Sequence, residues 1–110
     1  MNSKKSGEIG EELAAIMLVE KGYRIIARNF LCRMGEIDIV AYKNGVIAFV
    51  EVKTRLSDGY GSGREAVTAA KQQRIKLCAE YFLSNFSGFY KEADFQVIEI
   101  SAVHITGLEF

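Results

Sequence analysis

The sequence predicts an α/β domain in which helices flank a mixed β-sheet, and three observations support that prediction. Residues 7–21 and 64–86 repeat apolar side chains at helical spacing. The dipeptide Asn44-Gly45 stands between two strand-like apolar segments and is the strongest short hairpin signal. A β-rich segment follows the second helical repeat. We therefore expect the order α-β-β-β-α-β, with a candidate for a further β-strand at the end.

Each element follows from a local pattern. In the first helix, Ile9, Leu13 and Ile16 form an apolar stripe, and Gly22 is suited to end the helix. Residues 23–32 are rich in β-branched and aromatic side chains, which favours a first strand. Residues 55–65 contain three glycines, which favours a mobile loop that acts as a flap near the substrate. The last strand candidates are residues 94–100 and 102–108.

Length and composition favour a single domain, residues 1–110, without linkers. Lys and Arg together number 14, as do Asp and Glu, so any binding of nucleic acid must rely on a local cluster of cations. Cys32 and Cys78 lack CxxC spacing, which argues against a zinc knuckle and a disulfide scaffold, and favours the reduced cytoplasm. The longest apolar run, residues 13–19, is too short to span a membrane.

The Asn44-Gly45 turn also predicts which residues face each other across the hairpin. With these two residues as the turn, Asp38 faces Glu51, and Glu36 faces Lys53. Because side chains alternate along a strand, all four are expected on one side of the sheet. The other side is expected to carry Ile37, Ile39, Val50 and Val52.

Two carboxylates that face each other across neighbouring strands destabilise a sheet. Their Cβ atoms would lie about 5 Å apart, and at an effective dielectric constant near 20 their charges repel by roughly 3 kcal/mol. Three arrangements relieve this repulsion: a divalent cation, a proton shared between the acids, or a lysine or arginine drawn into the pair. The first of these would make a metal site from Asp38 and Glu51.

A metal at this position has a definite chemistry. Magnesium, or manganese in its place, prefers oxygen ligands and is held by one or two carboxylates together with water and substrate phosphate. Asp38 and Glu51 would anchor it, with the backbone carbonyl of Val52 within reach. Lys53 projects from the same face and would position or deprotonate a water molecule, or hold the scissile phosphate; the sequence leaves these roles open.

Several segments together resemble the uncharacterised YraN-like bacterial family, over nearly the whole chain. Within that family the D...ExK arrangement is similar to the PD-(D/E)xK nucleases, which include restriction endonucleases and archaeal Holliday junction resolvases. The resemblance implies a restriction endonuclease-like fold and a Mg²⁺- or Mn²⁺-dependent endonuclease acting on branched or structured DNA. The segments that carry it are Gly10-Glu11, "RNF" at 28–30, "GEIDIV" at 35–40 and "FVEVKTR" at 49–55.

The same resemblance implies a role for each matching residue. Asp38 and Glu51 correspond to metal ligands, Lys53 to the catalytic lysine, and Glu11 to a supporting acid that also contacts the metal. Glu36 either assists the metal or pairs with Lys53.

Glu11 has an independent reason to lie near the site. Ala14, Ala15 and Leu18 follow it at helical spacing, so Glu11 belongs to the stripe that faces the sheet. The alternative is a solvated acid favoured by the helix dipole in the first turn.

Two positions depart from the family pattern. The nuclease proline before the aspartate is Ile37 here, and the late strand carries Gln96 where the family is associated with an aspartate. Among the basic residues around the acids, Arg55 and Lys71 are expected to bind nucleic acid. Self-association into a homodimer would allow paired cuts. Two alternatives stay open: a binding or adaptor module without turnover, and a protein interface in which a partner's arginine satisfies the acids.

Overall fold

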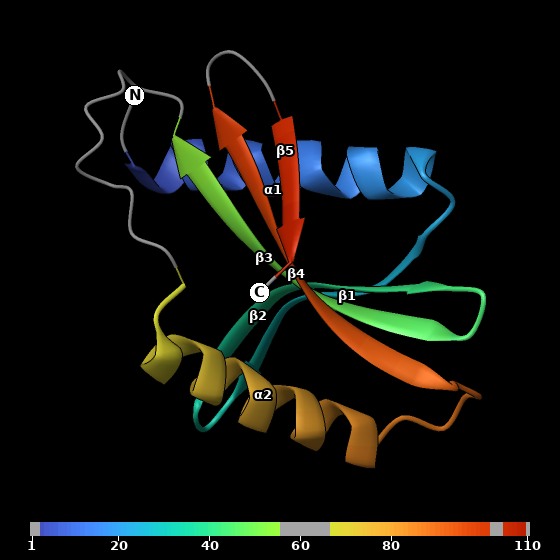
Figure 1. Cartoon of the computed structure of the whole chain (residues 1–110). Helices are drawn as coiled ribbons and strands as arrows, with labels where there is room; N and C mark the ends of the chain where they lie inside the picture. The colour runs from blue at the N-terminus through green and yellow to red at the C-terminus, as the bar shows by residue number, and fades with distance from the viewer. Residues whose placement is uncertain (1–2, 56–66, 102–104, 110) are drawn as a thin grey trace.

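The β-sheet is mixed, and two helices flank it (Figure 1). The computed structural model describes residues 3–55, 67–101 and 105–109. No helix in that part of the chain is long and apolar enough to cross a membrane. The helices are α1 (Ser3–Glu20) and α2 (Ala69–Ser84). The strands are β1 (Arg24–Cys32), β2 (Gly35–Lys43), β3 (Val46–Arg55), β4 (Glu92–Ser101) and β5 (Ile105–Glu109).

The strands lie in the sheet in their order along the chain, β1-β2-β3-β4-β5. Neighbouring strands are antiparallel except β3 and β4, which are parallel because α2 crosses between them. The expected order of helices and strands is therefore confirmed, and the further strand candidate at the end is β5.

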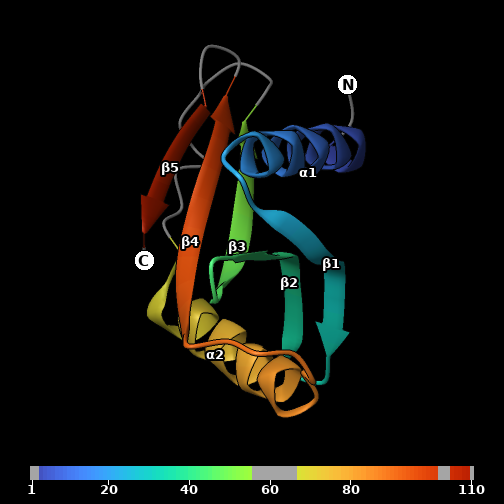
Figure 2. The same ribbon diagram turned by 90° about the vertical axis from the view of Figure 1, so that its right-hand side faces the viewer.

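Each helix covers one face of the sheet. On the α1 face, Leu18 packs with Ile39 and Val50. On the α2 face, the ring of Phe82 meets that of Phe49 edge to face, with 5.8 Å between the ring centroids. The two helices cover both faces of β3 (Figure 2). Its sequence is accordingly an almost continuous apolar run. A charged side chain within that run needs a partner.

The hairpin between β2 and β3 has the predicted turn, and it has the predicted register as far as the Ile39 and Val50 pair. The predicted pairs of Asp38 with Glu51 and of Glu36 with Lys53 are not part of the ladder. Asn44 and Gly45 have φ values of 51° and 83°, as a type I′ turn requires. The ladder then runs from the Lys43 and Val46 pair to the Ile39 and Val50 pair.

The prediction that Ile37 shares a face with Ile39 is wrong. Ile37 packs in the α2 cluster and Ile39 in the α1 cluster, although they are two residues apart. The ladder between β2 and β3 ends at Ile39, and the N–H of Val52 donates to Asp38 Oδ2 at 2.8 Å. Since the Asp38 side chain takes this N–H, β2 bends away while β3 continues beside β4 (Figures 1 and 2).

The helix ends differ from those expected. α1 begins at Ser3 rather than Gly7 and stops before Gly22, which has a φ of 98°. α2 begins at Ala69 because Thr68 caps it, its side chain accepting the N–H of Lys71 at 3.1 Å. Of the glycine-rich segment 55–65, expected to be a flap, Arg55 is the last residue of β3 and residues 56–65 lie outside the described residues. The expected start of the second helix, residues 64–66, also lies outside them.

The cysteines also depart from expectation. Cys32, the last residue of β1, forms a disulfide with the buried Cys78 of α2. Their separation of 46 residues along the chain gave no sign of this contact, because the packing of α2 against the sheet creates it.

A glycine allows α1 to approach β3 closely. Gly10 is buried, and a Cβ atom added there would lie 2.8 Å from Cβ of Thr54. Thr54 is β-branched and belongs to a strand, so it has little room to move. This contact sets the position of the next residue, Glu11.

We expect Gly10→Ala to lower the free energy of unfolding by about 1 to 3 kcal/mol, because the methyl group must displace Thr54 or the helix. Gly7→Ala on the same helix is the matched control, since an added Cβ there meets nothing within 4 Å. The control should stabilise the protein by about 0.5 to 1 kcal/mol. Urea denaturation measures both; equal stability of the two variants would contradict this account of the close approach.

Candidate functional site

Acidic side chains gather where β2 bends away from β3. Glu51 of β3 is only 7% exposed, and Asp38 of β2 is half-buried beside it. Glu11 reaches the same region from α1, and its charge and that of Glu36 both influence Asp38. The site residues predicted from the hairpin and from the first helix are therefore brought together.

Asp38 is held in an environment that disfavours its charge. Burial and, after it, the negative charge of Glu51 raise the pKa of Asp38 from 3.8 to about 7, while the hydrogen bond from the Val52 N–H opposes the rise. At neutral pH the Asp38 carboxyl is therefore close to half protonated.

Glu51 is neutralised by a residue that was expected to bind nucleic acid. Lys71 Nζ lies 2.7 Å from Glu51 Oε2, in an ion pair between β3 and the first turn of α2. Burial acts to lower the pKa of Lys71, but the hydrogen bond and charge of Glu51 outweigh it and the pKa is raised. The Thr68 cap holds the backbone of this first turn in place.

Glu11 lies on the inward stripe of α1, as its spacing predicted. Burial raises the pKa of Glu11, the Glu36 carboxylate adds to the rise, and the amide of Asn29 works against it. With its nitrogen turned toward the acids, that amide lies 3.1 Å from Glu11 Oε1 and 3.0 Å from Glu36 Oε2. Asn29 thus bridges the two acids from β1, where it has a φ of 51°.

The remaining predicted residues lie along the end of β3. Lys53 is half-buried and is in hydrogen-bonding contact with Lys71. The Val52 side chain packs toward α1, and its N–H is bound by Asp38. Arg55 Nε lies 2.9 Å from Glu99 Oε2 of β4, so an acid on the neighbouring strand already holds this guanidinium.

Of the three expected ways to relieve the paired acids, the structure shows the lysine, since Lys71 supplies the positive charge for Glu51. The raised pKa of Asp38 favours its protonated form in addition. Sequence reasoning missed Thr68, Asn29 and Glu99. A threonine just before a helical repeat is a cap signal that could have located Thr68. Asn29 is part of the "RNF" motif at 28–30, which marked its position but not its role, and nothing local to the chain indicates Glu99.

The acids suit a hard divalent cation in their chemistry. Their donors are all oxygen atoms, and the negative charge of Glu51 adds to the effect of burial in raising the pKa of Asp38. Within the described residues, no group of three or more His, Cys, Asp or Glu side chains is arranged to hold a metal ion. Magnesium needs only one or two carboxylates when water and phosphate complete its shell, so Asp38 and Glu51 remain a sufficient protein contribution.

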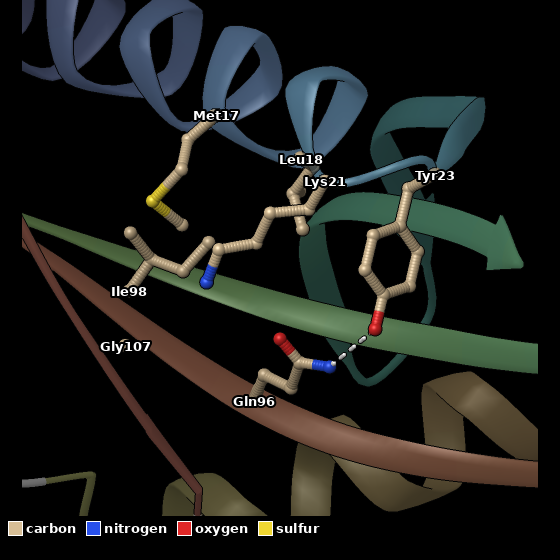
Figure 3. A pocket seen from close by; sticks show the side chains of 7 residues that line it. All are labelled: Met17, Leu18, Lys21, Tyr23, Gln96, Ile98 and Gly107. Carbon is tan, nitrogen blue, oxygen red and sulfur yellow. Dashed lines mark hydrogen bonds between the residues drawn. The ribbon is translucent and has the colours of Figure 1, made fainter.

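Gln96, the departure in the late strand, contacts Tyr23. Its amide nitrogen is 3.3 Å from the Tyr23 hydroxyl, on the α1 side of the sheet, whereas Glu51 pairs with α2 (Figure 3). Both residues line a cavity of about 240 Å³ at the end of α1, into which Lys21 also projects. Ligand pockets usually measure about 300 to 1,000 Å³, so this cavity is small for one.

The chain matches the model of a protein family, described as uncharacterised protein family UPF0102, over residues 10–100. It belongs to that family. The matched region includes α1 from Gly10, all three strands around the acidic cluster, and α2. The family resemblance inferred from the motifs is thereby confirmed.

Relatives in UPF0102 cover most of the chain. A UPF0102 protein of Symbiobacterium thermophilum is 48% identical over 98 residues, which span 89% of this chain and 83% of the relative. One of Alkaliphilus metalliredigens is 45% identical over 98 residues, which span 89% and 86% of the two chains. One of Clostridium perfringens is 44% identical over 99 residues, which span 90% of this chain and 81% of the relative.

We expect the free energy of unfolding to fall by about 2 to 3 kcal/mol between about pH 5 and pH 8. The folded state keeps a proton on Asp38 up to about pH 7, whereas the unfolded carboxyl loses it near 3.8. The folded state therefore binds more protons than the unfolded state in this window. The stabilisation is complete below pH 3.8, the pKa of Asp38 in the unfolded chain, and it is lost as the pH rises through about 7, the pKa of Asp38 in the folded protein.

Urea denaturation across that range measures the effect. Asp38→Asn is the control, because its amide oxygen can still accept the Val52 N–H but does not titrate. The variant should lose most of the pH dependence; the same slope in both proteins would assign it to other groups.

Proposed function

We propose that this protein is a divalent-metal-dependent endonuclease that hydrolyses phosphodiester bonds in DNA. One observation carries the proposal: Asp38 and Glu51 meet in a half-buried site where the negative charge of Glu51 helps to raise the pKa of Asp38 to about 7. Strongly shifted pKa values next to a second acid and a lysine are typical of catalytic sites. The D...ExK motif supports the same function.

Each residue would have a separate task. Asp38 and Glu51 would hold Mg²⁺ or Mn²⁺ through carboxylate oxygens, with the Val52 carbonyl as a further candidate ligand. The ion would supply charge neutralisation at the scissile phosphate and a lowered pKa for water. Lys53 would hold a phosphate oxygen or orient the attacking water. Glu11 would support the site from α1, where its raised pKa suits a proton-holding role.

The substrate class we propose is branched or otherwise structured DNA, as in the junction resolvases that the motifs resemble. The chain has equal numbers of acidic and basic residues, so attraction to DNA must come from local cations. Arg55 and Lys71 are the candidates, although Glu99 and Glu51 now hold them. A homodimer would provide two such sites for paired cuts.

We place this activity in the cytoplasm, where DNA is present. Disulfides are rare in that compartment, so Cys32 and Cys78 would be thiols there. Cys78 Sγ lies 3.6 Å from the carbonyl oxygen of Gly35, which can accept a hydrogen bond from the reduced thiol.

A second function is favoured by the ion pair of Glu51. Because Lys71 already neutralises this carboxylate, the fold is satisfied without a metal, as a DNA-binding or adaptor module would be. Binding of Mn²⁺, measured by calorimetry, separates the two functions. The adaptor requires no binding, or equal binding by wild type and Asp38→Asn.

With Mg²⁺ or Mn²⁺, the purified protein should cut at least one member of a panel of linear, flapped and four-way DNA substrates. Asp38→Asn, Glu51→Gln and Lys53→Ala should each lower the cleavage rate by about 100-fold or more, since each removes a charge from the reacting centre. Gel electrophoresis of labelled DNA measures the rates.

Lys91→Ala serves as the control for Lys53→Ala, because Lys91 is exposed and precedes β4, away from the acids. This variant should keep the wild-type rate. An intact substrate panel with metal-loaded wild type, or undiminished cutting by Asp38→Asn, would refute the nuclease proposal.

A further inference from the structure

The carboxylate of Glu51 is already paired with a cation of the protein, the ammonium group of Lys71, where the proposed metal would bind. Its side chain is 9% exposed, and Lys71 Nζ lies 2.7 Å from Oε2. A carboxylate this deeply buried is costly without a positive partner. Lys71 therefore stabilises Glu51 in the metal-free protein.

Other basic side chains near the acids are differently placed. Arg55 is engaged by Glu99 of β4. Arg28 pairs with Glu12 on the outer part of α1, at 2.9 Å. Lys71, which also contacts Lys53 of β3, pairs directly with Glu51 by way of the capped first turn of α2.

The Lys71 side chain is placed so that its ammonium group can move away from Glu51 into solvent. Its side chain is 37% exposed, so water can reach the ammonium group without unfolding of α2. A lysine side chain is flexible and contacts a carboxylate through a single ammonium group, without the two parallel hydrogen bonds that an arginine can form. A positive charge in the first turn of a helix is also disfavoured by the helix dipole.

A divalent ion on Glu51 and an ammonium group 2.7 Å from the same carboxylate would repel each other strongly. We propose that Lys71 is a built-in counter-cation that competes with the divalent metal for Glu51 and is displaced when the metal binds. This inference rests on the proposed function, because it takes Glu51 as a metal ligand. It assigns Lys71 to control of metal affinity rather than to a fixed contact with nucleic acid.

Calorimetric titration with MnCl₂ tests the competition. Lys71→Met keeps much of the apolar stem but removes the competitor, so it should bind Mn²⁺ about tenfold more tightly than wild type. Lys71→Arg keeps the positive charge and should bind no more tightly than wild type. Lys76→Met removes the same charge from an exposed position on α2 and should match wild type.

Thermal unfolding gives a readout that does not depend on the calorimetry. In EDTA, Lys71→Met should melt below wild type, because Glu51 has lost its partner. Saturating Mn²⁺ should raise its melting temperature more than that of wild type, since bound metal replaces the missing charge. Circular dichroism of each variant establishes that it is folded before titration.

The outcomes separate the two proposals. If wild type binds Mn²⁺ and Lys71→Met binds it equally or more weakly, the competition is refuted while the metal site stands. If no variant binds Mn²⁺, both the metal site and the competition are refuted. If Lys71→Met binds more tightly but wild type cuts no DNA, the competition stands and the nuclease proposal fails.

Discussion

The hydrogen bond from the Val52 N–H to the Asp38 carboxylate is the contact on which the arrangement of the site depends. By taking the N–H that would continue the ladder toward Ile37, the side chain ends the pairing of β2 with β3. β2 can then bend, so that Ile37 packs under α2 while Ile39 stays under α1. Acids from a helix and two strands lie near one another at the point where the ladder ends.

This arrangement concentrates charge, and the fold balances that charge from several directions. An ammonium group comes from α2, a proton is retained on Asp38, and the Asn29 amide lies between Glu11 and Glu36. Each of these is a weak or exchangeable partner compared with a buried guanidinium pair. The buried acids of this region are therefore compatible with folding without a bound ion.

Much of the fold and the central pair of acids could be predicted because short-range signals set them. Asn44 and Gly45 fix the hairpin turn, and counting outward gives the ladder as far as Ile39 and Val50, the residues next to Asp38 and Glu51. The partner of Glu51 could not be predicted, since it depends on where α2 docks after a long crossover. The prediction for Ile37 was wrong because it assumed that side chains alternate along an unbroken ladder. That assumption takes no account of the Asp38 side chain, which accepts the Val52 N–H in place of a backbone carbonyl.

The parallel pairing of β3 with β4 has a consequence for how the protein is made. Every residue of β3 from Val46 to Arg55 pairs with a residue between Glu92 and Ser101. On the ribosome, the nascent chain therefore carries a strand with an apolar, unpaired edge until β4 has emerged from the exit tunnel. Open edges of this kind recruit other chains. The interval between the emergence of β3 and that of β4 is thus when the chain is most exposed to aggregation.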